Sequence, residues 1–228
     1  MAGHVSGDGR RYTKPGVRLP IDTALRVRPV AAYVSRGGEK LNDALRGWPI
    51  PVQDRVCRDI GASTGGFTDC LLQRGALSVY AVDVGYGQLA ASLRNDQRVV
   101  VLERTHVRDL PALDPIPTVI TLDVSFISAT TALAAAAGRA APGSDVLVLV
   151  KPQFEAGREA VDERGVVRDP VDRARAIAGV LAWVRDRGWR AGGVRISPLR
   201  GPAGNREFFC WLRTPDRSLD DDRPGSAR

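Results

Sequence analysis

The sequence predicts an α/β protein whose main domain is a doubly wound, mostly parallel sheet. Strand-like apolar runs alternate with helical patterns from residue 56 to residue 187, and a glycine-containing turn joins the first of these strands to its helix. Two further strand-like runs close the chain without a helix between them, which predicts a C-terminal antiparallel strand. A chain of 228 residues is long enough for one such domain with a small appendage.

The elements can be assigned in order. Short apolar alternations and tight turns over residues 3–28 predict small strands, and an amphipathic helix is predicted at residues 39–48. The remaining predicted strands are residues 56–60, 79–83, 99–103, 118–123 and 145–150, and the helices are residues 66–74, 87–95, 129–141 and 170–187. Residues 192–197 and 207–212 predict the closing hairpin, with residues 199–206 as its loop.

The turn Asp59-Ile60-Gly61-Ala62-Ser63-Thr64-Gly65-Gly66-Phe67 is the strongest candidate for a binding site. A strand that turns through glycines into a helix presents free backbone N–H groups to a ligand. We expect Gly61 to allow a tight turn, and Gly65 and Gly66 to let a ligand approach the main chain. Asp83 ends the next strand, where an acid can accept hydrogen bonds from both hydroxyls of a ribose. These features predict a nucleoside cofactor at the carboxyl edge of the sheet.

Ser63 narrows the choice of cofactor. The dinucleotide fingerprint G-x-G-x-x-G has a glycine at this position, and a serine side chain would crowd a diphosphate. The absence of G-K-[ST] excludes a P-loop. S-adenosyl-L-methionine has a ribose and no phosphate, so it suits this turn, and a nicotinamide dehydrogenase is disfavoured. The motif alone also allows a tight turn that binds no ligand.

Composition restricts partners and location. Residues 1–46 hold nine Lys/Arg and four Asp/Glu, so +5 of the net charge of +7 lies there. This predicts a polyanionic partner, most simply nucleic acid, although a solvated basic arm is an equal alternative. No apolar run reaches about 18 residues, so we expect no membrane segment. The three cysteines lack metal spacing, so we expect no metal site. Since no signal peptide is visible either, we expect a cytoplasmic protein. Cys57 and Cys210 are expected in the core.

Lysine is rare in this chain. Only three of the 33 basic residues are lysines. Arginine stays protonated whereas lysine can lose its proton, so a surviving lysine is a candidate for a role that arginine cannot fill. Lys151 lies at the tip of one predicted strand and Asp123 at the tip of another; Glu207 begins the antiparallel strand at the same edge of the sheet. Any one of these residues is more often part of a surface salt bridge, but their convergence beside a cofactor turn favours an active site.

The region from Tyr33 to Leu212 resembles the TlyA (haemolysin A) family, cytidine ribose methyltransferases of ribosomal RNA in the FtsJ-like class. The stretches that carry the resemblance are residues 33–38, 59–67, 83–89, 93–96, 123–128, 150–154, 165–170 and 201–205. The resemblance implies a Rossmann-like S-adenosylmethionine-dependent methyltransferase fold. It also implies a Lys-Asp-Lys-Glu catalytic set at Lys40, Asp123, Lys151 and Glu207. We expect Lys151 to be the general base, with Lys40 and Asp123 setting its charge state and Glu207 orienting it.

The resemblance also implies the binding residues. Those expected to bind the cofactor are Asp59, Gly61, Ser63, Thr64, Gly65, Gly66, Phe67, Asp83, Val84, Thr105, His106, Asp109 and Asp123. Asp59 and the turn would hold the methionine end, Asp83 the ribose, and Asp109 with the backbone of residues 105–106 the adenine. His106 stands where relatives are expected to have asparagine. Those expected to bind RNA are Arg10, Arg11, Lys14, Arg18 and Arg36, and residues 155–168 are expected to form a lid over it.

The expected domains follow from the same comparison. Residues 1–28 would form a partial S4-like RNA-binding segment that retains only the strand half, and residues 29–36 a linker. Residues 37–213 would form the methyltransferase domain and residues 214–228 a disordered tail. The expected partners are ribosomal RNA and ribosomal subunits. The alternative is a catalytically idle RNA-binding or ribosome-associated protein that keeps the fold, and nothing in the sequence supports a haemolytic activity.

Overall fold

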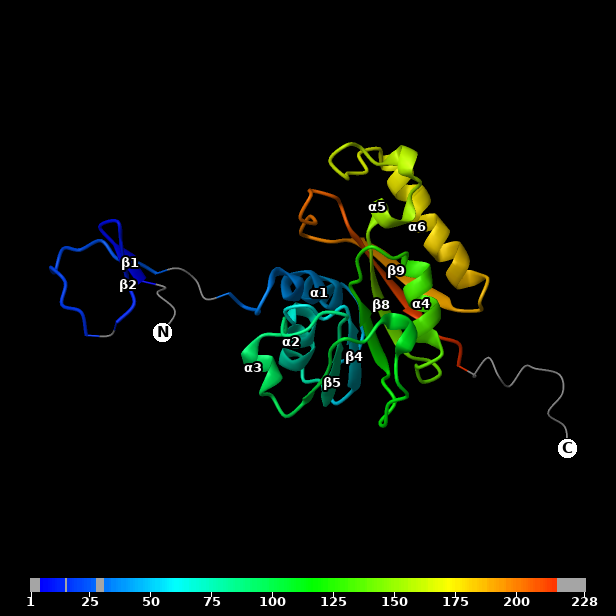
Figure 1. The fold of residues 1–228 in the computed structure, drawn as a ribbon, viewed down its shortest axis with the longest axis horizontal. Helices are drawn as coiled ribbons and strands as arrows, with labels where there is room; N and C mark the ends of the chain where they lie inside the picture. Colours follow the sequence, from blue (N-terminus) through cyan, green and yellow to red (C-terminus); the bar gives the residue numbers. More distant parts are fainter. Residues whose placement is uncertain (1–4, 15, 28–30, 217–228) are drawn as a thin grey trace, which may run out of the picture. The chain divides into compact units, whose positions relative to one another are not determined.

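The computed structural model describes residues 5–14, 16–27 and 31–216. The chain divides into two compact units, Met1–Ala32 and Tyr33–Arg228, and the division falls inside the predicted linker. Figure 1 shows both units in the colours of the sequence. We describe each unit separately.

The N-terminal unit is a three-stranded antiparallel sheet in the order β2-β1-β3. Its strands are β1 (Val5–Gly7), β2 (Arg10–Tyr12) and β3 (Arg26–Val27). Asp8 and Gly9 both have positive φ angles, as a two-residue hairpin turn requires. The predicted small strands are therefore present, and their relation to half of an S4 domain remains a prediction.

The second unit contains a seven-stranded sheet in the order β6-β5-β4-β7-β8-β10-β9. Its strands are β4 (Val56–Ile60), β5 (Ser78–Val82), β6 (Val99–Leu102), β7 (Val119–Leu122), β8 (Asp145–Val150), β9 (Arg190–Ile196) and β10 (Phe208–Arg213). β4 to β8 are parallel, and β10 runs antiparallel to β8 and β9. The predicted fold class is confirmed. The strand order reverses between β4 and β7, and ligands of such sheets bind at this switch point.

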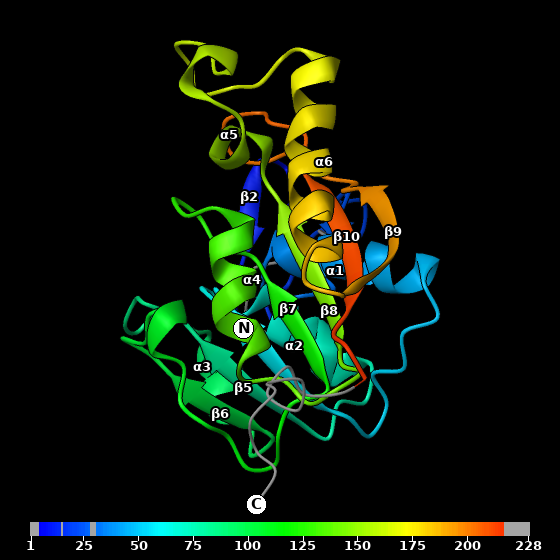
Figure 2. The same cartoon turned by 90° about the vertical axis from the view of Figure 1, so that its right-hand side faces the viewer.

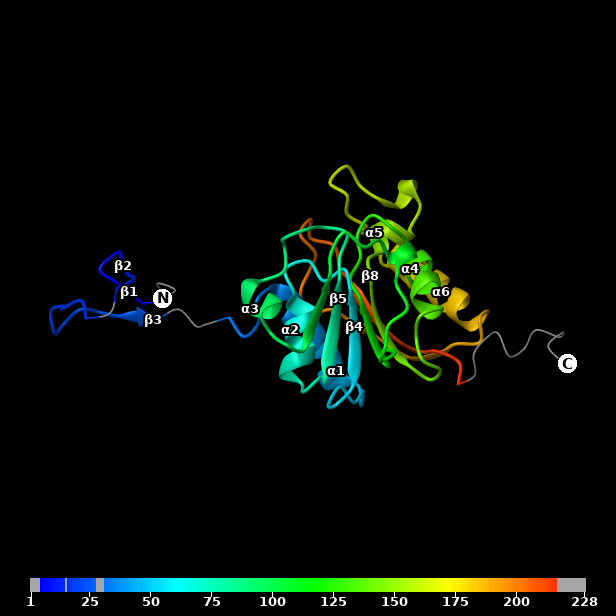
Figure 3. The same cartoon turned by 60° about the horizontal axis from the view of Figure 1, so that its bottom comes forward.

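Helices cover both faces of this sheet (Figures 2 and 3). They are α1 (Arg36–Gly47), α2 (Gly66–Gln73), α3 (Ala91–Arg94), α4 (Ala129–Ala137), α5 (Pro152–Glu155) and α6 (Pro170–Arg185), with 3-10 turns η1 (Val107–Asp109) and η2 (Arg158–Ala160). α1 and α2 pack on one face, around Leu41 and Leu71, and α4 and α6 pack on the other, around Leu133 and Val180. Because both faces are covered, the central strands β4, β7 and β8 are buried along their whole length, and β4 buries the charged residues Arg58 and Asp59 among its apolar ones.

Some predicted boundaries were wrong. The helix expected at residues 87–95 is only Ala91–Arg94, because Gly87 has a φ of 71° and the chain turns there. The helix expected at residues 129–141 ends at Ala137, before Gly138.

The predicted disordered tail, residues 214–228, includes at least one residue that packs against the domain. Thr214 is buried, and its hydroxyl accepts from the Ser144 N–H at 2.8 Å and donates to the Ala141 carbonyl at 3.1 Å. Residues 217–228 lie outside the described part. Cys57 and Cys210 are buried in the two cores, as expected. In the described segments, no helix has the length and apolarity needed to cross a membrane.

Candidate active site

The turn between β4 and α2 is as tight as the sequence predicted. Gly61 has a φ of 86°, and a Cβ placed on it would lie 2.4 Å from the carbonyl oxygen of Asp123. Only glycine avoids this clash, so the end of β7 can pack directly against the turn. Gly61 and Ala62 both donate their N–H groups to the Val82 carbonyl, which fixes the turn against β5.

Gly65 and Gly66 also give room to neighbouring segments of the chain, and their predicted contact with a ligand remains a prediction. A Cβ on Gly65 would lie 2.2 Å from the side chain of Leu93, and a Cβ on Gly66 would lie 2.3 Å from Ser35 Oγ. These glycines therefore make room for the protein's own segments next to the turn. Gly65 also needs to be glycine for its backbone conformation, since it precedes α2 in the left-handed region with a φ of 98°.

Asp59 lies behind the turn and is fully buried. Its carboxylate accepts from Thr68 Oγ1 at 2.7 Å and from Thr121 Oγ1 at 3.0 Å, which joins β4 to α2 and β7. Burial raises the pKa of Asp59 to about 6, against the opposing effect of these two hydrogen bonds. Asp59 thus holds the turn from inside, and its contact with the methionine end of the cofactor remains a prediction.

Asp83 follows β5 and organises the next loop. Its two carboxylate oxygens accept the N–H groups of Ser63 at 2.8 Å and Gly85 at 2.7 Å. Each oxygen can accept a further hydrogen bond, so the carboxylate can still bind ribose hydroxyls. The Thr105 N–H donates to the Asp83 carbonyl, which brings the predicted adenine side next to the predicted ribose side.

The structure brings the four predicted catalytic residues to the carboxyl edge of the sheet as two ion pairs. Asp123 and Lys151 directly follow β7 and β8, and Glu207 precedes β10, whose residue Phe208 pairs with Val150. Lys151 Nζ lies 2.7 Å from Asp123 Oδ1. Lys40 Nζ, from α1, lies 2.6 Å from Glu207 Oε2, so Glu207 contacts Lys40 rather than Lys151.

A cavity of about 310 Å³ joins this edge to the turn. It is lined by the turn residues 61–64, Gly66 and Phe67, by the start of α1 and by Arg200 of the 199–206 loop. Lys40 and Asp123, one residue from each ion pair, also line it. The cofactor turn therefore shares one cavity with Lys40 and Asp123, and each of these residues pairs with another candidate catalytic residue.

Comparison with known proteins decides the family. Residues 33–214 match the model of the FtsJ-like methyltransferase family. The chain is 51% identical over 223 residues to a 16S/23S rRNA (cytidine-2'-O)-methyltransferase, TlyA, of Mycobacterium tuberculosis, covering 96% of this chain and 83% of that protein. The chain belongs to the FtsJ-like methyltransferase family.

Two other relatives carry a different name. A Brachyspira hyodysenteriae protein named Hemolysin A is 40% identical, with 92% of this chain and 89% of that one covered. A Streptococcus thermophilus structure with the provisional name hemolysin has a TM-score of 0.79 and 43% identity, over 95% of this chain and 80% of that one. The predicted TlyA (haemolysin A) resemblance is confirmed. S-adenosylmethionine-dependent methyltransferases also share the fold at 15% and 14% identity, so fold and family agree with the predicted cofactor.

The other predicted cofactor residues of this FtsJ-like domain surround the loops after β5 and β6. Val84 is 65% exposed, and His106 precedes η1 and accepts the Arg108 N–H through Nδ1 at 3.2 Å. Asp109 ends η1 and is exposed. Their contact with adenine remains a prediction.

The predicted RNA-binding residues lie in two places. Arg10, Arg11, Lys14 and Arg18 are exposed in the N-terminal unit. Arg36 begins α1, lines the cavity and donates to the Arg200 carbonyl at 3.3 Å. Arg36 thus lies at the candidate active site, within the same unit as the cavity.

An aromatic pair beside the site was missed in the sequence. Phe126 is 92% exposed with a φ of 65°, which is rare for a residue with a side chain, and its ring centroid lies 5.5 Å from that of Phe154. Phe126 comes three residues after Asp123, and Phe154 three residues after Lys151. This equal spacing from two strand-tip residues was the signal in the sequence that could have predicted the aromatic pair. An exposed, strained aromatic at an active site is suited to stacking on a base.

The predicted lid contacts the 199–206 loop, and both lie at the same end of the sheet (Figure 1). Asn205 is buried; its Nδ2 donates to the Gly165 carbonyl at 2.8 Å, and its Oδ1 accepts the Val167 N–H at 3.0 Å. These hydrogen bonds join residues 155–168 to the 199–206 loop at Asn205, which lies two residues before Glu207 in the sequence. Whether residues 155–168 cover RNA remains a prediction.

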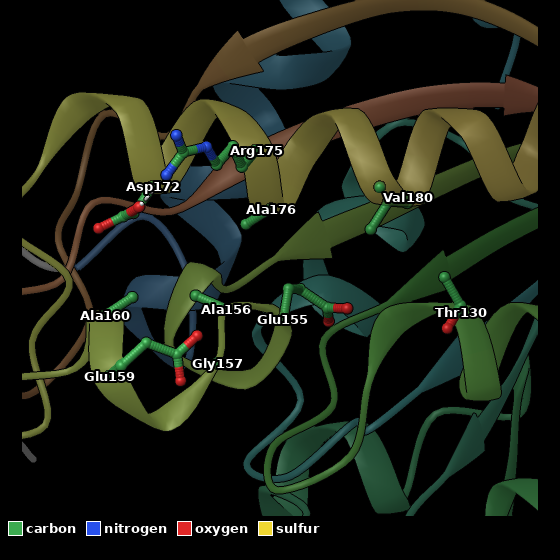
Figure 4. Close-up of a pocket in the computed structure, with 11 residues that line it drawn as sticks. Thr130, Glu155, Ala156, Gly157, Glu159, Ala160, Asp172, Arg175, Ala176 and Val180 are labelled. Atoms are coloured by element: carbon green, nitrogen blue, oxygen red, sulfur yellow. Dashed lines mark hydrogen bonds and ion pairs between the residues drawn. The ribbon is translucent and has the colours of Figure 1, made fainter.

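A second cavity, of about 340 Å³, lies between η2, the end of α5 and α6 (Figure 4). Its charged lining residues are Glu155, Glu159, Asp172 and Arg175, and Arg175 forms an ion pair with Asp172 at 3.0 Å. Glu155 is already used, because it accepts the Ala129 N–H at 2.6 Å and the Ser128 hydroxyl at 2.9 Å at the start of α4. None of the predicted site residues lines this cavity.

Proposed function

We propose that this chain methylates the 2′-hydroxyl of a cytidine ribose in ribosomal RNA, with S-adenosylmethionine as methyl donor. The observation that carries the proposal is the Lys151–Asp123 ion pair at the sheet edge, with Asp123 lining the same cavity as the cofactor turn. The 51% identity to an enzyme named for this reaction supports the choice of substrate.

The residues present fit the cofactor. The turn residues line a cavity beside Asp123, and Asp83 retains lone pairs for a ribose. Because Ser63 occupies the place where a dinucleotide site needs glycine, a donor without phosphates fits better. Residues 61–67, Asp83 and Val84 would hold the cofactor, which supplies an activated sulfonium methyl group when bound.

Lys151 is the proposed general base. A ribose hydroxyl is a poor nucleophile until a base takes its proton. The Lys151 amine is held at the carboxyl edge of the sheet, since its Nζ lies 2.7 Å from Asp123 Oδ1 and its side chain is only 11% exposed. Its task is to remove the proton while the site aligns the hydroxyl oxygen with the methyl group.

Lys40 is proposed to act through its charge. It lines the cavity and is fixed by Glu207, whose side chain is 1% exposed. A preorganised cation in a partly dry site stabilises negative charge that develops on the attacking oxygen. Glu207 would keep Lys40 in position.

RNA would be bound by charge and by stacking. Arg36 and Arg200 line the cavity and can contact phosphates, and Phe126 can stack on a base near the target. The exposed basic residues of the N-terminal unit, Arg10, Arg11, Lys14 and Arg18, would add sequence-independent affinity. We propose ribosomal subunits as the physiological form of this substrate.

The test is nucleoside mass spectrometry of ribosomal RNA incubated with the purified chain and S-adenosylmethionine. Free RNA and isolated small and large subunits are compared. The proposal predicts 2′-O-methylcytidine at defined positions. Binding of S-adenosylmethionine without any methylated nucleoside would instead support the catalytically idle RNA-binding protein.

A further inference from the structure

We propose that Ser125 is a positioning residue for Lys151, holding the amine so that its lone pair faces the ribose hydroxyl. This inference deepens the proposed function and rests on it. Ser125 belongs to the loop after β7 and was not assigned a role from the sequence.

The contacts of Lys151 carry the argument. Its Nζ donates to Ser125 Oγ at 2.8 Å and lies 2.7 Å from Asp123 Oδ1. The hydrogen-bond acceptor Ser125 and the ion-pair partner Asp123 come from one short loop, two residues apart. The amine is thus held from two directions by groups that follow the same strand.

A neutral amine has two N–H donors and one lone pair in a tetrahedral arrangement. One N–H of Lys151 is directed at Ser125 Oγ. Asp123 Oδ1 lies 2.7 Å from Nζ as an ion-pair partner, but it accepts no hydrogen bond in the described part of the chain, so it does not fix the rotation of the amine. Without Ser125, the group could rotate about the Cε–Nζ bond, and the lone pair would face the substrate only part of the time.

The proton balance of the step agrees with this arrangement. As the O–C bond to the methyl group forms and the C–S bond breaks, the hydroxyl O–H bond breaks and a third N–H bond forms on Lys151. The resulting ammonium keeps its hydrogen bond to Ser125 and its ion pair with Asp123, and later releases its proton to water. Ser125 accepts a hydrogen bond throughout and never carries the proton.

The surrounding loops fix Ser125 relative to Lys151. Phe126, directly after Ser125, has a φ of 65° that turns the chain, and its ring contacts that of Phe154 at 5.5 Å. Phe154 lies three residues after Lys151. This aromatic contact ties the loop that carries Ser125 to the segment that carries Lys151, so the hydroxyl and the amine are held together from both sides.

The experiment compares Ser125→Ala and Ser125→Thr with the wild-type chain in single-turnover methylation of ribosomal RNA. We expect Ser125→Ala to lower the rate at saturation about 10- to 100-fold, as for other losses of alignment, without changing the dissociation constants for S-adenosylmethionine or RNA. Ser125→Thr keeps the hydroxyl and should restore most of the rate. Ser128→Ala is the matched control, since Ser128 caps α4 and bonds Glu155 instead of Lys151.

The outcomes separate the possibilities. A Ser125→Ala rate within twofold of wild type overturns the inference, as does an equal loss in Ser128→Ala, which would show a general effect of the loop. Failure of threonine to restore the rate also overturns it. A wild-type chain that transfers no methyl group contradicts the proposed function itself, and this is seen before any variant is compared.

Discussion

Replacing Glu207 by glutamine should destabilise the protein strongly, because the Lys40–Glu207 pair is buried. The two charges lie 2.6 Å apart, and their side chains are 11% and 1% exposed. Removing one charge of a buried pair leaves the other without compensation and costs about 3–5 kcal/mol. For a domain of this size that corresponds to a melting temperature lower by about 6–20 °C. Urea unfolding and calorimetry measure both quantities.

Two further variants make this measurement specific. Asp186→Asn breaks the exposed Arg185–Asp186 pair, with 80% and 59% exposed side chains, and should change stability by less than about 0.5 kcal/mol. The double variant Lys40→Met/Glu207→Leu should recover stability toward wild type while methyl transfer stays absent. A loss below about 1 kcal/mol for Glu207→Gln would refute the description of a buried, mutually dependent pair.

Three other predictions follow from single side chains. Asp83→Ala should weaken S-adenosylmethionine binding about 10- to 100-fold by removing charge-assisted hydrogen bonds, and an unchanged affinity in isothermal titration would contradict its placement. Arg58 is fully buried, and its Nε, Nη1 and Nη2 have no hydrogen-bond partner in the described part of the chain. Arg58→Met should therefore raise the free energy of unfolding by roughly 1–4 kcal/mol, measured by urea unfolding. A lower free energy of unfolding would mean that the guanidinium is compensated by a polar group. Burial raises the pKa of Asp59 to about 6 from 3.8, so the folded state binds this proton more tightly than the unfolded chain. The free energy of unfolding should therefore fall by about 2 kcal/mol from pH 4 to 7, and Asp59→Asn should lack this slope.

The parallel sheet could be predicted because its strands are short apolar runs bounded by turns. Strand tips at the carboxyl edge then placed Asp123, Lys151 and Glu207 together, since register and direction alone bring them there. The closing antiparallel strand was predictable from the lack of an intervening helix. These conclusions depend only on local pattern and topology.

Side-chain partners were not predictable in the same way. Glu207 binds Lys40, which comes from a helix 167 residues away in sequence, and no local pattern encodes that pairing. Gly65 and Gly66 were predicted to admit a ligand, but their packing against Leu93 of α3 and against Ser35, which precedes α1, has no local signal in the sequence. The left-handed backbone of Phe126 was equally hidden, because the sequence offers no glycine or asparagine there.

The most direct test of the account is single-turnover methylation of ribosomal RNA by Lys151→Arg, with a cofactor titration on the same protein. Arginine keeps the positive charge and can still pair with Asp123, but it stays protonated and cannot act as a base at neutral pH. The account predicts loss of methyl transfer by at least about 100-fold, with S-adenosylmethionine affinity unchanged. Turnover close to wild type would contradict the assignment of Lys151 as general base and leave it as a positive clamp on the RNA.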